Sequence, residues 1–269
     1  MGTIVPFFIP HQGCPHRCVY CDQRAVTGRI ETLPTTTTLL ATIADYRRTA
    51  NDGPLEVAFY GGTFTALSLD LQESLLEPLQ PLLVEGLVAA IRVSTRPDAI
   101  TAAGAAMLRE HGVGLVELGI QSLAESVLEQ SDRGYGAAAV EQAFALLRAA
   151  GLKVGAQLMP GLPGDGPDTT QTTMARIIGL KPDLLRIYPT LVLAGTRLAE
   201  LFQAGTYQPL TIAEAVAICK EMVQLAAVAG IPVGRVGLQP TAELAAPGVV
   251  LAGPYHPAFR QLVEGVRWF

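Results

Sequence analysis

The stretch TIVPFFIPHQGCPHRCVYC, residues 3–21, joins a short apolar run to a loop that holds three of the four cysteines of the chain. Residues 3–9 predict a β-strand, because they form a short apolar, β-branched segment that ends at a proline. Cys14, Cys18 and Cys21 follow in the spacing CxxxCxxC. A cluster this compact does not resemble a disulfide framework, and in a reducing cytosol it indicates a metal site. We therefore expect a strand that leads directly into a metal-binding loop.

The rest of the chain alternates short apolar runs with longer helical patterns. Further strands are predicted at residues 55–60, 90–95, 115–120, 153–159 and 184–188, with a weaker candidate at 231–235. Helices are predicted at residues 36–50, 69–85, 101–111, 137–150, 169–178 and 212–229. This rhythm is typical of a parallel α/β sheet with both faces covered, and six units suit a (β/α)6 partial TIM barrel. We expect a single domain: a barrel at 1–236 with an irregular extension, residues 237–269, packed on it.

Composition narrows the class of protein. The chain has 269 residues, of which 49% are hydrophobic and 16% charged, and its formal net charge is -5. A sizeable buried core is expected, and there is no global basic field that would favour nucleic acid as a partner. We find neither a signal peptide nor an apolar run of about 18 residues, the length that a membrane helix needs. A cytoplasmic protein is expected.

The chemistry of the cysteine loop leaves two kinds of metal site open. Three thiolates can hold three irons of a 4Fe-4S cluster and leave the fourth iron accessible for chemistry. The alternative is a structural zinc site that takes His11 or His16 as its fourth ligand. Either histidine could instead orient the loop. Cys219 lies in the middle of a helical pattern, where a cysteine most often serves as a small core residue.

The loop resembles the signature of the radical S-adenosylmethionine (SAM) superfamily, in which an aromatic residue, here Tyr20, precedes the last cysteine. The resemblance extends from residue 8 to about residue 207, and it is strongest to the branch of the Elongator catalytic subunit and oxygen-independent coproporphyrinogen III oxidase. The matching segments are YGGTF at 60–64, STRPD at 94–98, ELGIQS at 117–122, DRG at 132–134, MPGLPG at 159–164, LRIYPT at 185–190, GT at 195–196 and AGTY at 204–207. This resemblance implies a 4Fe-4S cluster on Cys14, Cys18 and Cys21 and SAM as cofactor. The Elongator subunit also has an acetyltransferase domain, which we do not expect here because too few residues follow residue 207.

The resemblance also implies where SAM binds. Gly61, Gly62 and Thr63 would contact its amino end, because glycine lets the backbone approach a ligand closely. The alternative interpretation of these three residues is a plain tight turn, which we would favour if the cysteine loop were absent. Gln121 and Arg133 would contact the ribose or the carboxylate, since an arginine fork can bond both carboxylate oxygens. For Arg133 the alternative is a surface arginine near a helix end.

Two positions depart from the pattern of these families. Ser94 stands where they carry an acidic residue at the end of the third strand, and Gln157 stands where the oxidase carries an aspartate on the fifth. We still place both residues at the SAM site, although both changes remove a negative charge. Glu117, inside the predicted fourth strand, would need a partner if its side chain faced the interior of the barrel.

The resemblance implies an enzyme that cleaves SAM reductively to a 5′-deoxyadenosyl radical, which acts on an unidentified substrate, either an RNA base or a small molecule. No acid–base pair or nucleophile stands out, so no catalytic side chain is assigned. Arg17, Arg24 and Arg29 make a local positive edge that suits an acidic flavodoxin- or ferredoxin-type electron donor, and equally suits charge balance for three thiolates. Ser94 and Gln157 motivate an alternative, an iron–sulfur electron-transfer protein that does not turn over SAM.

Overall fold

A computed structural model describes residues 3–28, 33–49 and 53–265 of the chain. Seven strands form one sheet in the order β1-β2-β3-β4-β5-β6-β8, and the strand pairs recorded in it are parallel. The six predicted strands and the weaker seventh candidate are confirmed, with ends that differ by three residues or fewer. Their bounds are β1 Thr3–Phe8, β2 Leu55–Tyr60, β3 Val88–Thr95, β4 Val113–Gln121, β5 Lys153–Leu158, β6 Leu184–Ile187 and β8 Val233–Val236.

Helices follow most strands, as the sequence predicts. Five of the predicted helices are present as α2 Thr36–Thr49, α5 Ala102–Glu110, α7 Ala137–Ala149, α8 Pro167–Leu180 and α10 Ile212–Val228. The single helix predicted at residues 69–85 is wrong, because it is divided into α3 Leu69–Leu76, a 3-10 turn at Glu77–Leu79 and α4 Gln80–Val84. Pro78 and Pro81 explain the division, since proline lacks the N–H that an uninterrupted helix requires.

Four short helices escaped prediction. They are α1 Gln23–Thr27, α6 Glu125–Gln130, α9 Arg197–Gln203 and α11 Phe259–Glu264. Each spans seven residues or fewer, which is too short for a helical period to stand out in the sequence. Among the described residues no helix is long and apolar enough to cross a membrane.

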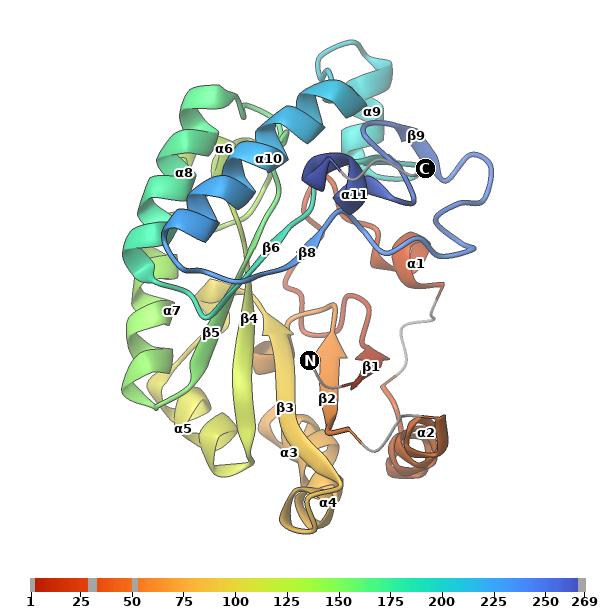
Figure 1. The fold of residues 1–269 in the computed structure, drawn as a ribbon, viewed down its shortest axis with the longest axis vertical. Coiled ribbons are helices and arrows are strands. Elements are labelled where there is room, and N and C mark those ends of the chain that lie inside the picture. The colour runs from red at the N-terminus through yellow and green to blue at the C-terminus, as the bar shows by residue number, and fades with distance from the viewer. Residues whose placement is uncertain (1–2, 29–32, 50–52, 266–269) are drawn as a thin grey trace. The chain divides into compact units, whose positions relative to one another are not determined.

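The chain divides into two compact units, each assembled from several segments. The first comprises Met1–Pro15, Arg29–Leu118 and Gln142–Val154. In it β1, β2, β3 and most of β4 pair in parallel, α2 packs on β1, and α4 packs on β3 (Figure 1). The aromatic rings of Phe7 and Phe64 lie 5.8 and 5.4 Å from the ring of Phe59, which is fully buried. These rings form part of the core beneath the carboxyl ends of β1 and β2.

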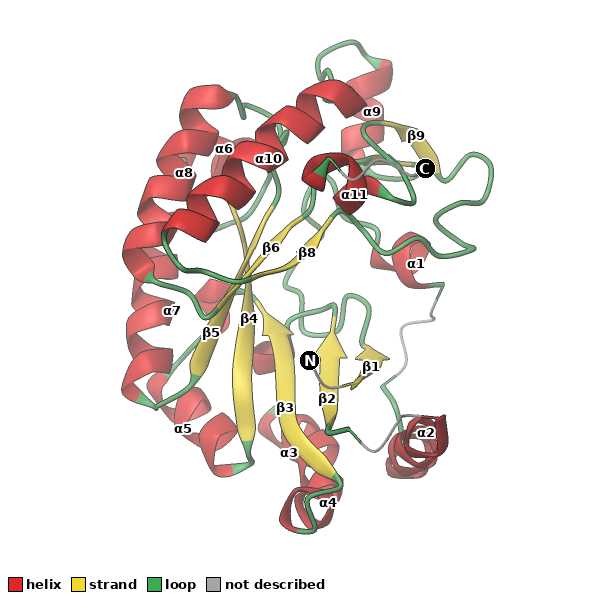
Figure 2. Cartoon of the chain, in the orientation of Figure 1, coloured by secondary structure: helices red, strands yellow, loops and turns green. Residues whose placement is uncertain are grey.

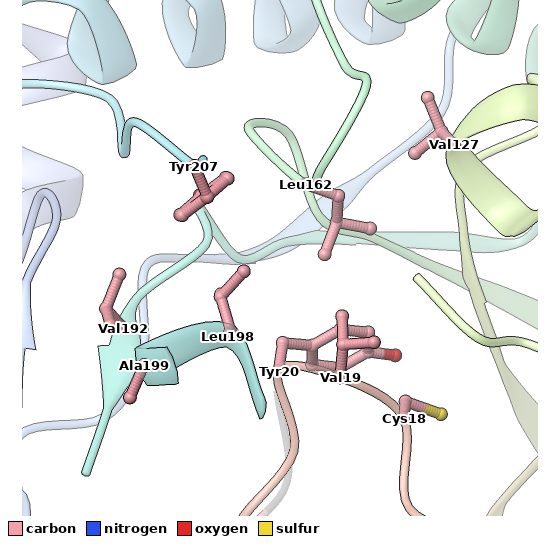
Figure 3. Packing of buried hydrophobic residues seen from close by; sticks show 9 residues of the cluster. All are labelled: Cys18, Val19, Tyr20, Val127, Leu162, Val192, Leu198, Ala199 and Tyr207. Carbon is pink, nitrogen blue, oxygen red and sulfur yellow. The ribbon is translucent and has the colours of Figure 1, made fainter. Parts of the chain in front are cut away.

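The second unit comprises His16–Gly28, Gly119–Glu141 and Gly155–Phe269. Its strands β5, β6 and β8 are parallel, α10 packs on α8 and β8, and α11 packs on α10 and β8. Figure 3 shows a hydrophobic cluster of this unit, formed by Cys18, Val19, Tyr20, Val127, Leu162, Val192, Leu198, Ala199 and Tyr207. Because Cys18, Val19 and Tyr20 belong to this core, the middle of the cysteine loop is packed against apolar side chains.

The segment after β8 is mostly irregular, as expected from its prolines and glycines, and Figure 2 shows it largely as loop. It contributes one short strand, β9 Val250–Ala252, which pairs antiparallel with β7 Val192–Leu193. Leu244 from this segment is buried beside Leu191 and Leu193. The segment therefore has its own apolar anchor in the second unit.

Candidate cofactor site

The first part of the cysteine loop follows β1 and is fastened to the turn that follows β2. His11 adopts a left-handed conformation with φ 58°, and its carbonyl accepts a hydrogen bond from the backbone N–H of Cys14. The backbone N–H of Thr63 donates to the carbonyl of Gln12 at 2.7 Å. Cys14 Sγ and Thr63 Oγ1 lie 3.3 Å apart, and the Thr63 side chain is fully buried. The structure thus brings together two residues, Cys14 and Thr63, that the sequence assigns to one site.

Glycine is required where these two turns meet. Gly61 and Gly62 have φ values of 79° and 60°, which only glycine adopts readily. A Cβ atom on Gly62 would lie 2.4 Å from the carbonyl oxygen of Gln12 and 2.6 Å from that of Ile9. Gly13 is equally constrained, because its Cβ would lie 2.3 Å from the carbonyl oxygen of Thr63. Gly13 and Gly62 therefore allow the two turns to approach each other closely, and the contact of Gly61 and Gly62 with SAM stays a prediction.

Ser94 lies near the end of β3, opposite a buried acid. It pairs in register with Glu117 on β4, whose side chain is only 4% exposed. Arg92 Nη1 lies 3.7 Å from the Glu117 carboxylate, and Tyr60 Oη donates to it at 3.4 Å. Arg92 also forms an ion pair with Glu56. Glu117 has the partner that its burial requires, and a carboxylate is present on the strand beside Ser94.

The second half of the cysteine loop is held in the second unit by Arg133. Its side chain is 4% exposed, so the surface-arginine alternative is wrong. Arg133 Nη1 donates to Cys18 Sγ at 3.0 Å and to Tyr20 Oη at 2.9 Å, and Nη2 donates to the Gly119 carbonyl. Tyr135 Oη accepts from Nε at 3.1 Å and from Nη2 at 2.6 Å. Tyr135 was not predicted as a site residue. In the sequence its only distinguishing feature is that it directly follows the DRG segment.

The charges in this cluster are set by burial and by close neighbours. Burial raises the pKa of Tyr20 well above its ordinary value, although Arg133 opposes the shift, so Tyr20 remains a neutral phenol. Burial alone would lower the pKa of Arg133, but Tyr135, Tyr20 and Cys18 outweigh it and the pKa lies above its ordinary value. Arg133 is thus a permanent buried cation against the sulfur of Cys18.

Hydrogen bonds between side chains and the backbone hold the two ends of the segment from His16 to Asp22, which contains Cys18 and Cys21. His16 Nε2 forms a hydrogen bond of 2.7 Å with the carbonyl oxygen of Asp132, which has φ 54°. The predicted orienting role of His16 therefore has a structural basis. After Cys21, the Asp22 carboxylate caps α1 by accepting from the backbone N–H groups of Arg24 and Ala25. Both contacts restrict the positions that Cys18 and Cys21 adopt.

Gln121 and Gln157 lie at the carboxyl ends of β4 and β5 in the second unit. Gln157 Nε2 is 3.4 Å from Gln121 Oε1, and the Gln121 carbonyl accepts from the N–H of Met159 at 2.9 Å. Gln121 is buried and has φ 70°, a strained value for a residue with a side chain. The two glutamines assigned to SAM on sequence grounds are therefore neighbours.

The donor set of the loop fits an iron–sulfur cluster. None of the four cysteines forms a disulfide, and soft thiolate ligands select iron–sulfur clusters or zinc. In the described part of the chain no three His, Cys, Asp or Glu side chains are already gathered around a common metal position. The assignment therefore rests on the chemistry of the three cysteines. A buried cation at Cys18 Sγ fits a ligand that must be a thiolate when it binds iron.

Cys219 is chemically unlike the loop cysteines. It is fully buried in α10, and burial raises the pKa of its thiol to about 12. At pH 8 only about one such thiol in 10,000 is ionised, and the thiolate is the reactive form. The prediction that Cys219 is a core residue agrees with this placement.

We expect alkylation of the cluster-free protein to distinguish these cysteines. At pH 8 iodoacetamide should modify the half-buried Cys14 and Cys21 at least about 100-fold faster than Cys219. Peptide mass spectrometry over a time course measures each rate, and urea-unfolded protein is the control in which the rates should converge. Equal rates in the folded protein would contradict the buried position of Cys219.

Comparison with known proteins identifies the family of the chain. The Radical SAM superfamily model matches residues 8–177, and the Radical_SAM C-terminal domain model matches residues 182–266. Because the first match covers more than half of the chain, the chain belongs to the radical SAM superfamily. It is accordingly a radical SAM enzyme, and its fold is the parallel α/β partial barrel of that superfamily.

Individual relatives lie in the branch that the sequence resembles. The tRNA uridine(34) acetyltransferase of Methanocaldococcus jannaschii is 32% identical over 184 residues, which are 61% of this chain and 34% of that protein. The chain therefore spans about a third of that relative. The structure of Methanocaldococcus infernus Elp3 with an N-terminal deletion has a TM-score of 0.75 at 22% identity, over 98% of this chain and 62% of that one. Coproporphyrinogen III oxidase (HemN) from Escherichia coli gives 0.59 at 19% identity, over 85% and 53%.

Proposed function

We propose that the chain binds a 4Fe-4S cluster through Cys14, Cys18 and Cys21 and uses it to cleave SAM reductively. The observation that carries this proposal is the CxxxCxxC loop, which directly follows β1 in a chain that belongs to the radical SAM superfamily. When bound, the cluster and SAM supply a one-electron cleavage of the sulfonium that yields a 5′-deoxyadenosyl radical. The protein contributes binding, orientation and the exclusion of water.

The first unit would hold the amino end of SAM. Gly61 and Gly62 present backbone groups at the end of β2, and Thr63 is held beside Cys14 by its hydroxyl. Backbone carbonyls at such a turn can accept hydrogen bonds from an ammonium group. Ser94 would offer a hydroxyl where related proteins offer a carboxylate, and Arg92 already engages the neighbouring Glu117.

Two residues of the second unit would hold the ribose. Gln121 and Gln157 carry amides at the ends of adjacent strands, and an amide can both donate to and accept from a hydroxyl. The amide of Gln157 can form a hydrogen bond with a hydroxyl group, as an aspartate at this position would, but it carries no charge. The resemblance also places Arg133 at SAM, and the hydrogen bond from Arg133 to Cys18 supports a second role at the cluster ligand.

We propose an RNA nucleoside as the substrate class, with tRNA as the first candidate. The support is the similarity to a tRNA uridine(34) acetyltransferase, although the chain spans only about a third of that protein. A small molecule is the competing substrate. We further propose a flavodoxin- or ferredoxin-type electron donor that meets the positive residues Arg17 and Arg24; Arg29, the third member of that edge, lies outside the described residues. A reducing cytoplasm would keep the loop cysteines as thiols.

The test is anaerobic. After cluster reconstitution, dithionite and SAM should yield 5′-deoxyadenosine, measured by chromatography, above the level from protein that was not reconstituted. Addition of total tRNA should raise the rate further, because radical formation in the absence of substrate is unproductive.

Two other results would redirect the proposal. A small-molecule extract that stimulates the reaction where tRNA does not would exclude the RNA substrate. A cluster that is reduced but gives no deoxyadenosine with any addition would favour the electron-transfer alternative. A colourless protein with one zinc per chain would exclude both.

A further inference from the structure

The contacts of Arg133 leave none of its N–H groups without a protein acceptor. A guanidinium has five N–H donors. Five hydrogen bonds use them: two from Nη1, to Cys18 Sγ and Tyr20 Oη, two from Nη2, to the Gly119 carbonyl and Tyr135 Oη, and one from Nε, to Tyr135 Oη. An arginine that binds the carboxylate of a ligand needs two N–H groups that no protein group accepts. In Arg133 all five N–H groups donate to protein atoms.

Tyr135 holds the guanidinium through Nε and Nη2, whereas Cys18 contacts Nη1. Its hydroxyl accepts two of the five bonds and donates to the Gly119 carbonyl at 2.9 Å. Its ring also lies 4.9 Å from the guanidinium carbon of Arg133, within the range of a cation–π contact. Three of the five hydrogen bonds that orient Arg133 thus go to β4 and Tyr135, and two go to the cysteine loop.

The Nη1 group of Arg133 points at the cysteine loop, where it contacts Cys18 and Tyr20. Cys18 is 8% exposed, and Figure 3 shows it beside Tyr20 in the hydrophobic cluster of the second unit. Hydrogen bonds and positive charge at a cluster sulfur favour the reduced, more negative state of an iron–sulfur cluster. Burial strengthens both effects, because water cannot screen them.

We propose that Arg133 is a positioning residue for the cluster ligand Cys18, held in place by Tyr135, and that it raises the reduction potential of the cluster. This inference rests on the proposed cluster site. It differs from the role implied by the resemblance, in which Arg133 binds SAM.

The test is a redox titration of the reconstituted cluster without SAM, followed by electron paramagnetic resonance. At the midpoint potential of the wild-type protein, Arg133→Gln should lower the ratio of reduced to oxidised cluster about tenfold, a shift of about 59 mV for one electron. Arg133→Lys keeps the charge but loses the fork, so its ratio should fall by less. Tyr135→Phe removes two of the five bonds to the guanidinium and should also lower the ratio, with milder effects on folding.

The matched control is Arg24→Gln. Arg24 lies three residues after Cys21, and its guanidinium is 3.7 Å from the Asp22 carboxylate. Its loss removes one positive charge from α1, the helix that follows the cysteine loop, whereas the charge of Arg133 is buried against Cys18. The ratio should stay within about twofold of wild type, since exposed charges are screened and the titration uses no protein electron donor. SAM affinity of the oxidised cluster, measured separately, should change less than about threefold in Tyr135→Phe.

The inference is overturned if the ratio is unchanged in Arg133→Gln, Arg133→Lys and Tyr135→Phe while SAM binding weakens. Arg133 would then be a SAM ligand only. If the wild-type protein itself takes up no cluster, the proposed function fails, and that result is distinct from failure of this inference.

Discussion

Cys18→Ala should abolish both cluster binding and SAM cleavage. Reconstituted wild-type protein should contain about four iron and four sulfide per chain, and the variant less than about a tenth of that, because loss of one of three thiolates leaves the cubane with too few ligands. Deoxyadenosine formation should fall to the level of protein without a cluster. Iron and sulfide analysis, together with the chromatographic assay, measures the two effects.

Cys219→Ala is the matched control for that variant. Both residues are buried, so either change removes a small buried side chain and costs about 1 kcal/mol of folding stability. Only Cys18 lies in the loop and receives a hydrogen bond from Arg133. Cys219→Ala should therefore retain the full cluster and full activity. A Cys18→Ala protein that still holds four irons would contradict the ligand assignment.

Gly62→Ala should destabilise the protein by about 2–5 kcal/mol and prevent assembly of the loop. The left-handed conformation costs an alanine about 1–2 kcal/mol. Its Cβ would also lie 2.4 Å from the Gln12 carbonyl oxygen, and overpacking of this kind costs about 1–3 kcal/mol more. The contacts of Thr63 with Gln12 and Cys14 would be displaced, so cluster content should fall together with stability.

Gly86→Ala is the control that separates the cost of the left-handed conformation from the cost of the steric overlap. Gly86 has φ 70°, close to the 60° of Gly62, but a Cβ there meets no atom within 4 Å. Its free energy of unfolding in urea should fall by the conformational cost alone, about 1–2 kcal/mol, and its cluster content should stay at the wild-type level. If stability and cluster content fell equally in the two variants, the close contact between the turns would not be the reason that residue 62 must be glycine.

The division of the predicted helix at 69–85 shows one limit of reasoning from periodicity. The apolar pattern continues through the segment, but Pro78 and Pro81 end the regular hydrogen-bond ladder. The short helices α6 and α9 went unpredicted for another reason. They have less than two turns, and tertiary packing rather than local pattern stabilises so short a helix.

The sequence by itself determined the strands, most of the helices and the cysteine loop, because strand and helix periods are local and a CxxxCxxC spacing lies within eight residues. It also indicated that the chain needs glycine at residues 61 and 62, directly after the second strand. Only the tertiary structure decided what these residues touch. Arg133 lies 115 residues from Cys18 along the chain, and the carbonyl groups that exclude a side chain at Gly62 belong to residues 9 and 12. Contacts of this kind depend on how distant strands are brought together, and no local pattern records them.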